Sequence, residues 1–192
     1  MQSYAEGKEE ESHLETKAKK MVEFIQIGLR VSALVTSIAA TSIVFTSKQT
    51  TLVFGIQMDA KYTYSSAFKF FAFTTAIASL FSFLSLGFTF ILRRVVSSKT
   101  KYHFFFFMHD LVIMSVLLAG CAAATAIGYV GQYGYEHAGW MPICDHFPTF
   151  CHKVTASVVL AYFSLIFFFF LTIISATKST SPFSQPTQIQ NL

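Results

Sequence analysis

The chain has 192 residues, of which 53% are hydrophobic and only 12% are charged, and its formal net charge is +4 at pH 7. Because soluble domains carry about 25% charged residues, this composition excludes an ordinary soluble protein, and the length leaves no room for an extramembrane catalytic domain. The Lys and Arg residues gather at the boundaries of long apolar runs, where they are typical of membrane topology signals, so we expect no nucleic-acid partner.

Four apolar runs of about 20 residues divide the chain, as expected for membrane-spanning helices. Residues 1–23, rich in Glu and Lys, are predicted to be a disordered or loosely helical tail, and residues 177–192, rich in Ser, Thr, Pro and Gln, a second tail. The expected fold is therefore an all-α membrane protein, a four-transmembrane-helix bundle. Its spans are predicted at about 24–46, 67–92, 104–129 and 154–176.

The basic residues also predict the orientation of the bundle. With four spans, both tails and the middle connection lie on one side of the membrane. These segments hold most of the Lys and Arg residues, including Lys17, Lys19, Lys20, Arg93 and Arg94. Cytoplasmic segments keep an excess of Lys and Arg, so we expect both termini in the cytoplasm.

Two residues that are fully charged at neutral pH lie inside the predicted spans, Arg30 in the first and Asp110 in the third. A charge in hydrocarbon costs at least about 2.5 to 3.5 kcal/mol, so each needs a partner. Both lie six positions after the start of spans that run in the same direction, which places them at the same depth. We predict an ion pair that fixes which helices are neighbours, with a proton or ion relay as the alternative. His109 points about 100° away around the helix and is predicted to be an interfacial or packing residue.

The third span carries Gly120, Ala124 and Gly128 at four-residue spacing. Lipid gives no hydrophobic drive for helix association, so close packing along such a flat strip of small residues must supply it. We predict that this strip packs against another helix. Packing within the chain is favoured, and contact between two chains is the alternative.

Cys144 and Cys151 lie in the loop 130–153, which the orientation above places outside the cell. Thiols oxidise there, so a disulfide is the leading interpretation. A metal site formed with His146 and His152 is the alternative, although the four residues are closer in sequence than known zinc ligands. We find no nucleophile arrangement and no nucleotide motif at a common depth, and so expect neither an enzyme nor a cofactor.

The loop and the spans together resemble a plant family, the Casparian strip membrane domain protein-like (CASP-like) proteins, and within it the first subgroup. The most specific match is the loop sequence from His137 to Cys151, which begins with His137-Ala138-Gly139-Trp140 and continues with Ile143-Cys144-Asp145 and Phe150-Cys151. Further matches are Leu29-Arg30, Ser47-Lys48-Gln49-Thr50, Lys61-Tyr62, the stretch 65–68 and Asp110.

The resemblance implies four-helix plasma-membrane proteins with cytoplasmic termini, a paired Arg and Asp in spans one and three, and homo- or heteromeric assembly. It also implies a fold similar to that of the MARVEL family. The founding members form immobile membrane platforms that recruit wall-modifying enzymes, and they carry an aromatic and acidic segment in the first outer loop. Here residues 51–61 read TLVFGIQMDAK instead, so the resemblance is to the family and not to the founding members.

The leading functional hypothesis is a non-enzymatic plasma-membrane scaffold that self-associates and organises a membrane domain. Its expected partners are further copies in a homodimer or larger homo-oligomer, related proteins in hetero-oligomers, membrane lipid, and extracellular wall-modifying enzymes. The alternative is a small oligomeric transporter or channel in which Asp110 couples protons.

Overall fold

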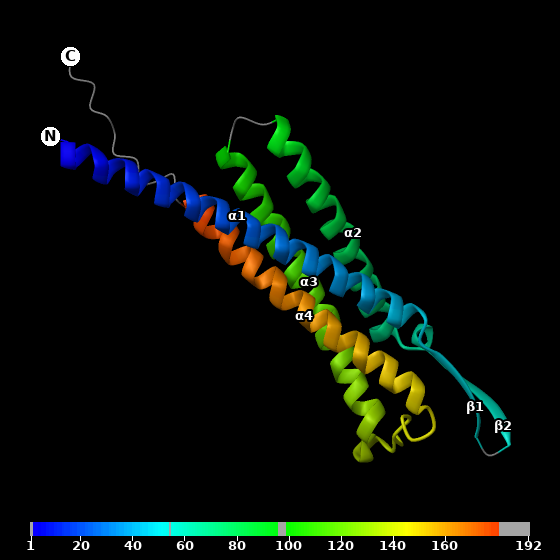
Figure 1. Cartoon of the computed structure of the whole chain (residues 1–192). Helices are drawn as coiled ribbons and strands as arrows, with labels where there is room; N and C mark the ends of the chain where they lie inside the picture. The colour runs from blue at the N-terminus through cyan, green and yellow to red at the C-terminus, as the bar shows by residue number, and fades with distance from the viewer. Residues whose placement is uncertain (1, 54, 96–98, 181–192) are drawn as a thin grey trace.

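The computed structural model describes residues 2–53, 55–95 and 99–180 (Figure 1). Its four long helices are α1 (Gln2–Phe45), α2 (Ser66–Val95), α3 (Lys99–Tyr133) and α4 (Pro148–Thr180). An antiparallel hairpin of β1 (Lys48–Val53) and β2 (Ile56–Lys61) joins α1 to α2, followed by the short 3-10 helix η1 (Tyr62–Tyr64). A second 3-10 helix, η2 (Glu136–Ala138), lies between α3 and α4.

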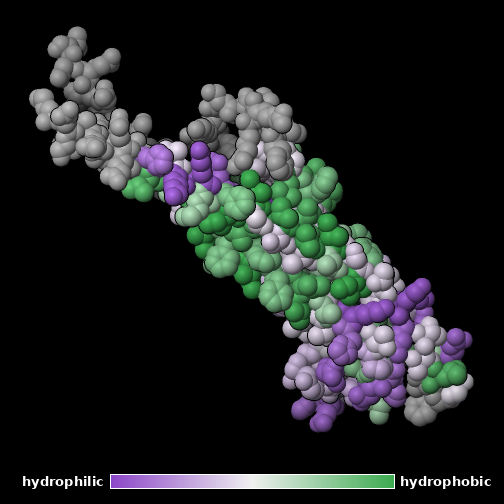
Figure 2. All heavy atoms as spheres, viewed as in Figure 1, coloured by the Kyte–Doolittle hydropathy of each residue, from purple (hydrophilic) through white to green (hydrophobic). Residues whose placement is uncertain are grey.

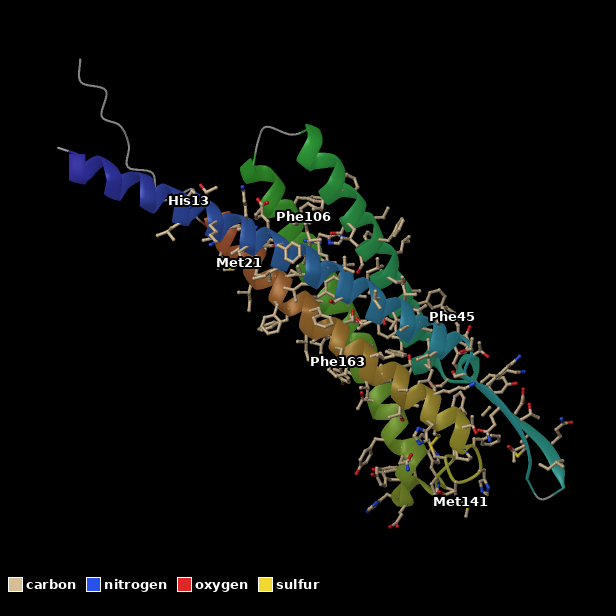
Figure 3. The ribbon with its side chains drawn as sticks, viewed as in Figure 1. His13, Met21, Phe45, Phe106, Met141 and Phe163 are labelled. Carbon is tan, nitrogen blue, oxygen red and sulfur yellow. A yellow bond between two sulfur atoms is a disulfide. The ribbon has the colours of Figure 1, made fainter. Side chains whose placement is uncertain are left out.

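All four helices are long and apolar enough to cross a membrane, over Thr16–Phe45, Ser66–Thr89, Phe104–Tyr133 and Pro148–Lys178. Figure 2 shows the apolar side chains as a broad band along the middle of the molecule, with hydrophilic side chains toward its ends. Phenylalanines such as Phe163, which is 50% exposed on α4, cover the outside of this band (Figure 3). The fold is therefore the predicted four-span helical membrane protein.

The helices form a four-sided bundle in which α1 packs beside α2 and α4, and α3 packs beside the same two helices. As a result, α1 and α3 face each other across the diagonal. The start of α1, the last turn of α4 and the facing ends of α2 and α3 lie at one end of the bundle, and the hairpin and η2 lie at the other (Figure 1). We call the latter the hairpin end.

The helices extend beyond the predicted spans. α1 begins at Gln2, so most of the range 1–23, predicted as a disordered or loosely helical tail, is helical. α4 begins at Pro148 and continues to Thr180, into the predicted tail 177–192, whose residues 181–192 lie outside the described residues. Helical hydrogen bonds need no apolar side chains, so a helix can continue past the hydrocarbon that hydropathy detects.

The hairpin was not expected in the first loop. Val53 pairs with Ile56 at its end, and Gly55 in the turn adopts φ 81°, a left-handed conformation that favours glycine. Two-residue hairpin turns need such positive φ values, but Gly55 lacks the preceding Asn, Asp or Gly that marks these turns most clearly, so the sequence signal was weak.

The contact between α1 and α4 is built from small residues. Ser157 Oγ donates to the Ala40 carbonyl at 2.7 Å, and Ser164 Oγ donates to the Ala33 carbonyl at 3.2 Å. Seven residues separate the two serines and the two alanines alike, as expected for antiparallel helices packed along one face. Small side chains let the backbones approach closely enough for these bonds.

Candidate functional site

The charged pair predicted from Arg30 and Asp110 is joined inside the bundle. Arg30 on α1 donates to both oxygens of Asp110 on α3, from Nη2 to Oδ2 at 2.8 Å and from Nη1 to Oδ1 at 3.2 Å. Arg30 is 4% exposed and Asp110 is 0% exposed. This two-bond geometry is the strongest arrangement open to an arginine and a carboxylate.

Three further side chains complete the pair, and we call the five residues the ion-pair cluster. Arg30 Nη1 also donates to Ser85 Oγ on α2, and its guanidinium centre lies 4.5 Å from the centroid of the Phe106 ring. His109 Nδ1 lies 3.2 Å from Asp110 Oδ1. The cluster thus draws side chains from α1, α2 and α3.

Two details differ from the sequence-based interpretation. The ion pair connects α1 to α3, which are diagonal and not neighbouring helices. His109 contacts Asp110, although it leaves the helix in another direction, because rotation about its side-chain bonds brings Nδ1 back to the carboxylate. Neither detail follows from position along the sequence.

The ion-pair cluster leaves no buried polar atom without a partner. Throughout the described part of the chain, every buried side-chain nitrogen or oxygen has a hydrogen-bond partner. A buried pair is costly to assemble but strongly destabilising to break, because the survivor becomes an uncompensated charge. The cluster can therefore define one arrangement of three helices.

Only part of the strip of small residues on α3 packs against other helices. A Cβ at Gly120 would collide with the side chain of Thr74 on α2, so glycine lets these two helices approach closely. Ala124, 1% exposed, lies in the core. Gly128 is outside this contact, because no atom lies within 4 Å of a Cβ placed there, and it lines a cavity at the hairpin end instead.

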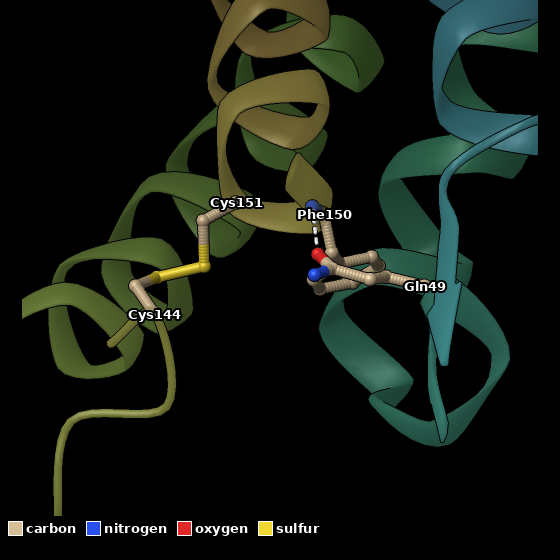
Figure 4. The surroundings of a disulfide bond; sticks show 4 residues. All are labelled: Gln49, Cys144, Phe150 and Cys151. Carbon is tan, nitrogen blue, oxygen red and sulfur yellow. Dashed lines mark hydrogen bonds between the residues drawn. A yellow bond between two sulfur atoms is a disulfide. The ribbon is translucent and has the colours of Figure 1, made fainter. Parts of the chain in front are cut away.

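Cys144 and Cys151 form the predicted disulfide, with their Cα atoms 5.7 Å apart (Figure 4). Pro148 begins α4, so Cys151 lies in the first turn of that helix and the bond ties the preceding loop to it. Both sulfurs are therefore unavailable to a metal ion. The described residues contain no group of three or more His, Cys, Asp or Glu residues that could hold one.

A hydrogen bond connects the two segments at the hairpin end. The backbone N–H of Phe150 donates to Oε1 of Gln49 on β1 at 2.8 Å (Figure 4). The first N–H groups of a helix have no partner within it, so Gln49 caps the start of α4 from a segment 101 residues away. The Phe68 and Phe150 rings, with centroids 6.1 Å apart, pack edge to face beside this contact.

Gly139 and Trp140, the motif predicted for the outer loop, form a tight turn. Gly139 ends η2 with φ 69°, in the left-handed region. Trp140 N donates to the Tyr135 carbonyl at 3.1 Å, and Tyr135 N donates to the Trp140 carbonyl at 2.9 Å. The turn leaves the Trp140 side chain 60% exposed at the surface of the hairpin end.

A charged contact lies at the base of the hairpin. Asp59 accepts hydrogen bonds from Lys61 Nζ at 2.6 Å and from the Tyr64 hydroxyl at 2.8 Å. The bond from Lys61 is the main cause that lowers the pKa of Asp59 below its ordinary value of 3.8, and the bond from Tyr64 adds to it. The same bond raises the pKa of Lys61 above its ordinary value.

The sequence interpretation missed Ser85 and Gln49 as partners. Ser85 is one of several serines on α2, and nothing in its sequence context separates it from the others. Gln49 belongs to the Ser47-Lys48-Gln49-Thr50 stretch that carries the family resemblance, but nothing in that stretch indicates that its amide caps a helix 101 residues away. A sequence signal did exist for the contact between α1 and α4. The spacing of Ser157, Ala161 and Ser164 puts these small residues on one face of α4.

Comparison with known proteins identifies the family of this chain. The sequence profile of the Casparian strip membrane protein domain matches residues 19–167. CASP-like protein 1F1 of Vitis vinifera is 51% identical over 153 residues, which is 80% of this chain and 74% of that protein. CASP-like protein 1F2 of Populus trichocarpa is 48% identical, over 80% of this chain and 84% of that protein.

CASP-like protein 1F1 of Ricinus communis is 45% identical over 91% of this chain and 97% of that protein. No solved structure matches the chain. The match of the domain and the extent of the identities confirm the predicted family, and this chain belongs to the Casparian strip membrane protein domain family as a CASP-like membrane protein.

Proposed function

We propose that this chain is a non-enzymatic scaffold of the plasma membrane, which self-associates and organises a membrane domain. Its termini lie in the cytoplasm, so the hairpin end faces the cell wall. There it recruits cell-wall-modifying partners. The names of its CASP-like relatives and of the matched domain support a membrane role of this kind.

The observation that carries the proposal is the closed state of the ion-pair cluster. A transporter that couples protons through Asp110 must expose this carboxylate to water during its cycle. Here the carboxylate is 0% exposed, and both of its oxygens accept hydrogen bonds from Arg30. A scaffold needs the pair held in this way, because the pair then serves to keep one helix arrangement.

The hairpin end has the features of a preorganised binding surface. The disulfide and the Gln49 contact hold the loop before α4 and the hairpin together. Apolar side chains are exposed on both segments, including Leu52 at 73% and Met141 at 81%. Figure 3 shows Met141 on the loop at this end of the molecule. A surface already held rigid loses less conformational entropy when a partner binds.

The first experiment is fluorescence recovery after photobleaching of the tagged full chain at the plasma membrane of a plant cell. A mobile four-span membrane protein at the same low expression level is the control. We expect patches that do not recover while the control does. Fluorescence recovery as fast as that of the control would refute the proposal that the chain forms a stable platform.

One observation favours the transporter as a second candidate, namely the contact of His109 with Asp110, which joins two groups able to exchange a proton. The purified full chain in lipid vesicles with a proton-sensitive dye distinguishes the two. A scaffold shows no proton flux, and Asp110→Asn changes nothing in this assay. Flux that Asp110→Asn abolishes while the variant keeps the helical content of the unmodified chain would establish the transporter.

A further inference from the structure

A cavity of about 540 Å³ lies at the hairpin end, between the base of β2, the start of α2, the end of α3, the loop before α4 and the start of α4. Its most buried wall residues are Val154, Phe147 and Phe150, of which none is more than 7% exposed. Its most exposed wall residues include Met141, and Lys61 and Asp59 add the charges. The cavity thus has an apolar interior and a charged margin.

The depth of this cavity matches the boundary between hydrocarbon and headgroups. Ile127 precedes the end of α3 by six residues, and Val154 follows the start of α4 by six. At about 1.5 Å per residue, both lie roughly 9 Å inside the helix ends. Both positions also fall within the segments apolar enough to span a membrane. The apolar interior therefore falls within or directly beside the apolar spans, whereas Asp59, Lys61 and Met141 of the margin lie outside them, as expected if acyl chains reach the interior and headgroups reach the margin.

The size and the lining of the cavity suit a long and flexible apolar group. A cavity of about 150 Å³ lined by apolar side chains takes up benzene and stays free of water, and this cavity is more than three times as large. Ligand sites commonly measure about 300 to 1,000 Å³. The methionines Met58 and Met141 in its lining adapt their shape to an irregular chain.

The margin selects the kind of headgroup. Lys61 Nζ lies 2.6 Å from Asp59 Oδ2, so the two charges are of opposite sign and balance each other. An anionic headgroup would meet the Asp59 carboxylate as well as the Lys61 ammonium. A zwitterionic headgroup can place its phosphate toward the ammonium and its cation toward the carboxylate.

We propose that this cavity binds one acyl chain of a zwitterionic phospholipid from the leaflet at the hairpin end, with the headgroup beside Asp59 and Lys61. Such a lipid would fill the space between the two segments that the scaffold presents to the cell wall. The proposal concerns lipid occupancy alone and stands whether or not the chain forms an immobile platform.

The test uses the full chain in lipid nanodiscs that contain a phosphatidylcholine with a photoreactive diazirine in one acyl chain. Irradiation should label the peptides that contain Ile127 and Val154. Gly128→Leu fills the cavity and should remove this label, because Gly128 lines it and has open space at its Cβ position. Gly87→Leu is the matched control, since Gly87 also has open space there, lies on α2 and does not line the cavity. It should keep the label.

Equal labelling of the two variants would overturn the proposal. So would label spread evenly over the outward faces of the helices in the unmodified chain, for instance at Phe163, and this readout requires no variant. If an equimolar sterol abolishes the label, the occupant of the cavity is a sterol and not an acyl chain, and the proposal is wrong. A diazirine phosphatidylserine that labels these peptides more strongly than the phosphatidylcholine would refute the zwitterionic headgroup.

Discussion

Replacing Asp110 by Ala should destabilise the bundle far more than replacing both members of the ion pair by apolar residues. The single change leaves the Arg30 guanidinium, 4% exposed, with Ser85 and the Phe106 ring but without a counter-charge. The double variant Arg30→Met with Asp110→Leu removes both charges and keeps most of the side-chain volume. The difference between them measures what an uncompensated charge costs in this bundle.

The structure sets the expected size of that difference. Loss of one partner from a buried ion pair costs about 3 to 5 kcal/mol, which corresponds to a factor of roughly 10² to 10⁴ in the ratio of folded to unfolded protein. The apolar double variant should lie close to the unmodified chain, because apolar replacements of buried pairs are commonly neutral or stabilising. The reversed pair, Arg30→Asp with Asp110→Arg, should recover only part of the loss, since Phe106 and His109 would then face the wrong charges.

The assay is reversible unfolding of the full chain in mixed micelles with an increasing fraction of sodium dodecyl sulfate, followed by circular dichroism. Lys61→Ala is the control, because it breaks a pair with Asp59 that is exposed to solvent, and such pairs contribute little. The reasoning fails if Asp110→Ala unfolds at the same detergent fraction as the unmodified chain. It also fails if the apolar double variant is no more stable than Asp110→Ala.

Three further predictions follow from the other contacts. Cys144→Ser should lower the free energy of unfolding by about 2 to 3 kcal/mol and expose the loop before α4 to protease, because the bond closes a loop with a sequence separation of 7. Gly120→Ala should cost about 1 to 3 kcal/mol in the same detergent titration, because its methyl group collides with Thr74. Acidification should loosen the hairpin, as measured by amide hydrogen exchange, because the lowered pKa of Asp59 makes its contact with Lys61 complete above the ordinary value of 3.8 and lost as the pH falls through the lowered value.

Each of the three has its own control. Unchanged cleavage of Cys144→Ser without a reducing agent would contradict the role of the disulfide. Gly28→Ala should cause no loss of stability, because no atom lies within 4 Å of its Cβ position. Thr74→Ala should restore part of the stability lost in Gly120→Ala, because it removes the hydroxyl and methyl groups that collide but keeps the Cβ atom 3.0 Å away. Asp59→Asn should make the protection of the hairpin amides, meaning their exchange rate relative to an unstructured peptide at the same pH, independent of pH over the acid range. A pH dependence of this protection that persists would assign it to another group.

The sequence predicted the number and the type of the helices because hydropathy alone selects segments that can lie in lipid. It also predicted the shared depth of Arg30 and Asp110, which depends only on helical rise. It could not predict that α1 and α3 are diagonal, since that depends on how each helix is rotated against its neighbours. The sequence also could not predict that Gly120 contacts a second helix while Gly128 does not. The four-residue spacing shows that both lie on one face of α3, but it does not show along which part of that face another helix packs.

The hairpin end was harder to predict because its contacts join segments that are distant in sequence. Gln49 meets Phe150 over a separation of 101 residues, and no periodicity reports such a contact. The disulfide between Cys144 and Cys151 could be predicted, because cysteines in an oxidising compartment commonly form disulfides. The cavity arises from five segments of the chain together, so no single stretch of sequence contains a signal for it.

The diagonal ion pair also has a consequence for the order of biosynthesis. Asp110 leaves the ribosome 80 residues after Arg30, which at about 5 to 20 residues per second is a delay of roughly 4 to 16 s. During this interval the first helix carries a guanidinium without its carboxylate, whether it waits inside the translocation channel or at its lipid edge. A nascent chain that ends after α2 should therefore stay associated with the insertion machinery, and one that extends through α3 should be released into the bilayer.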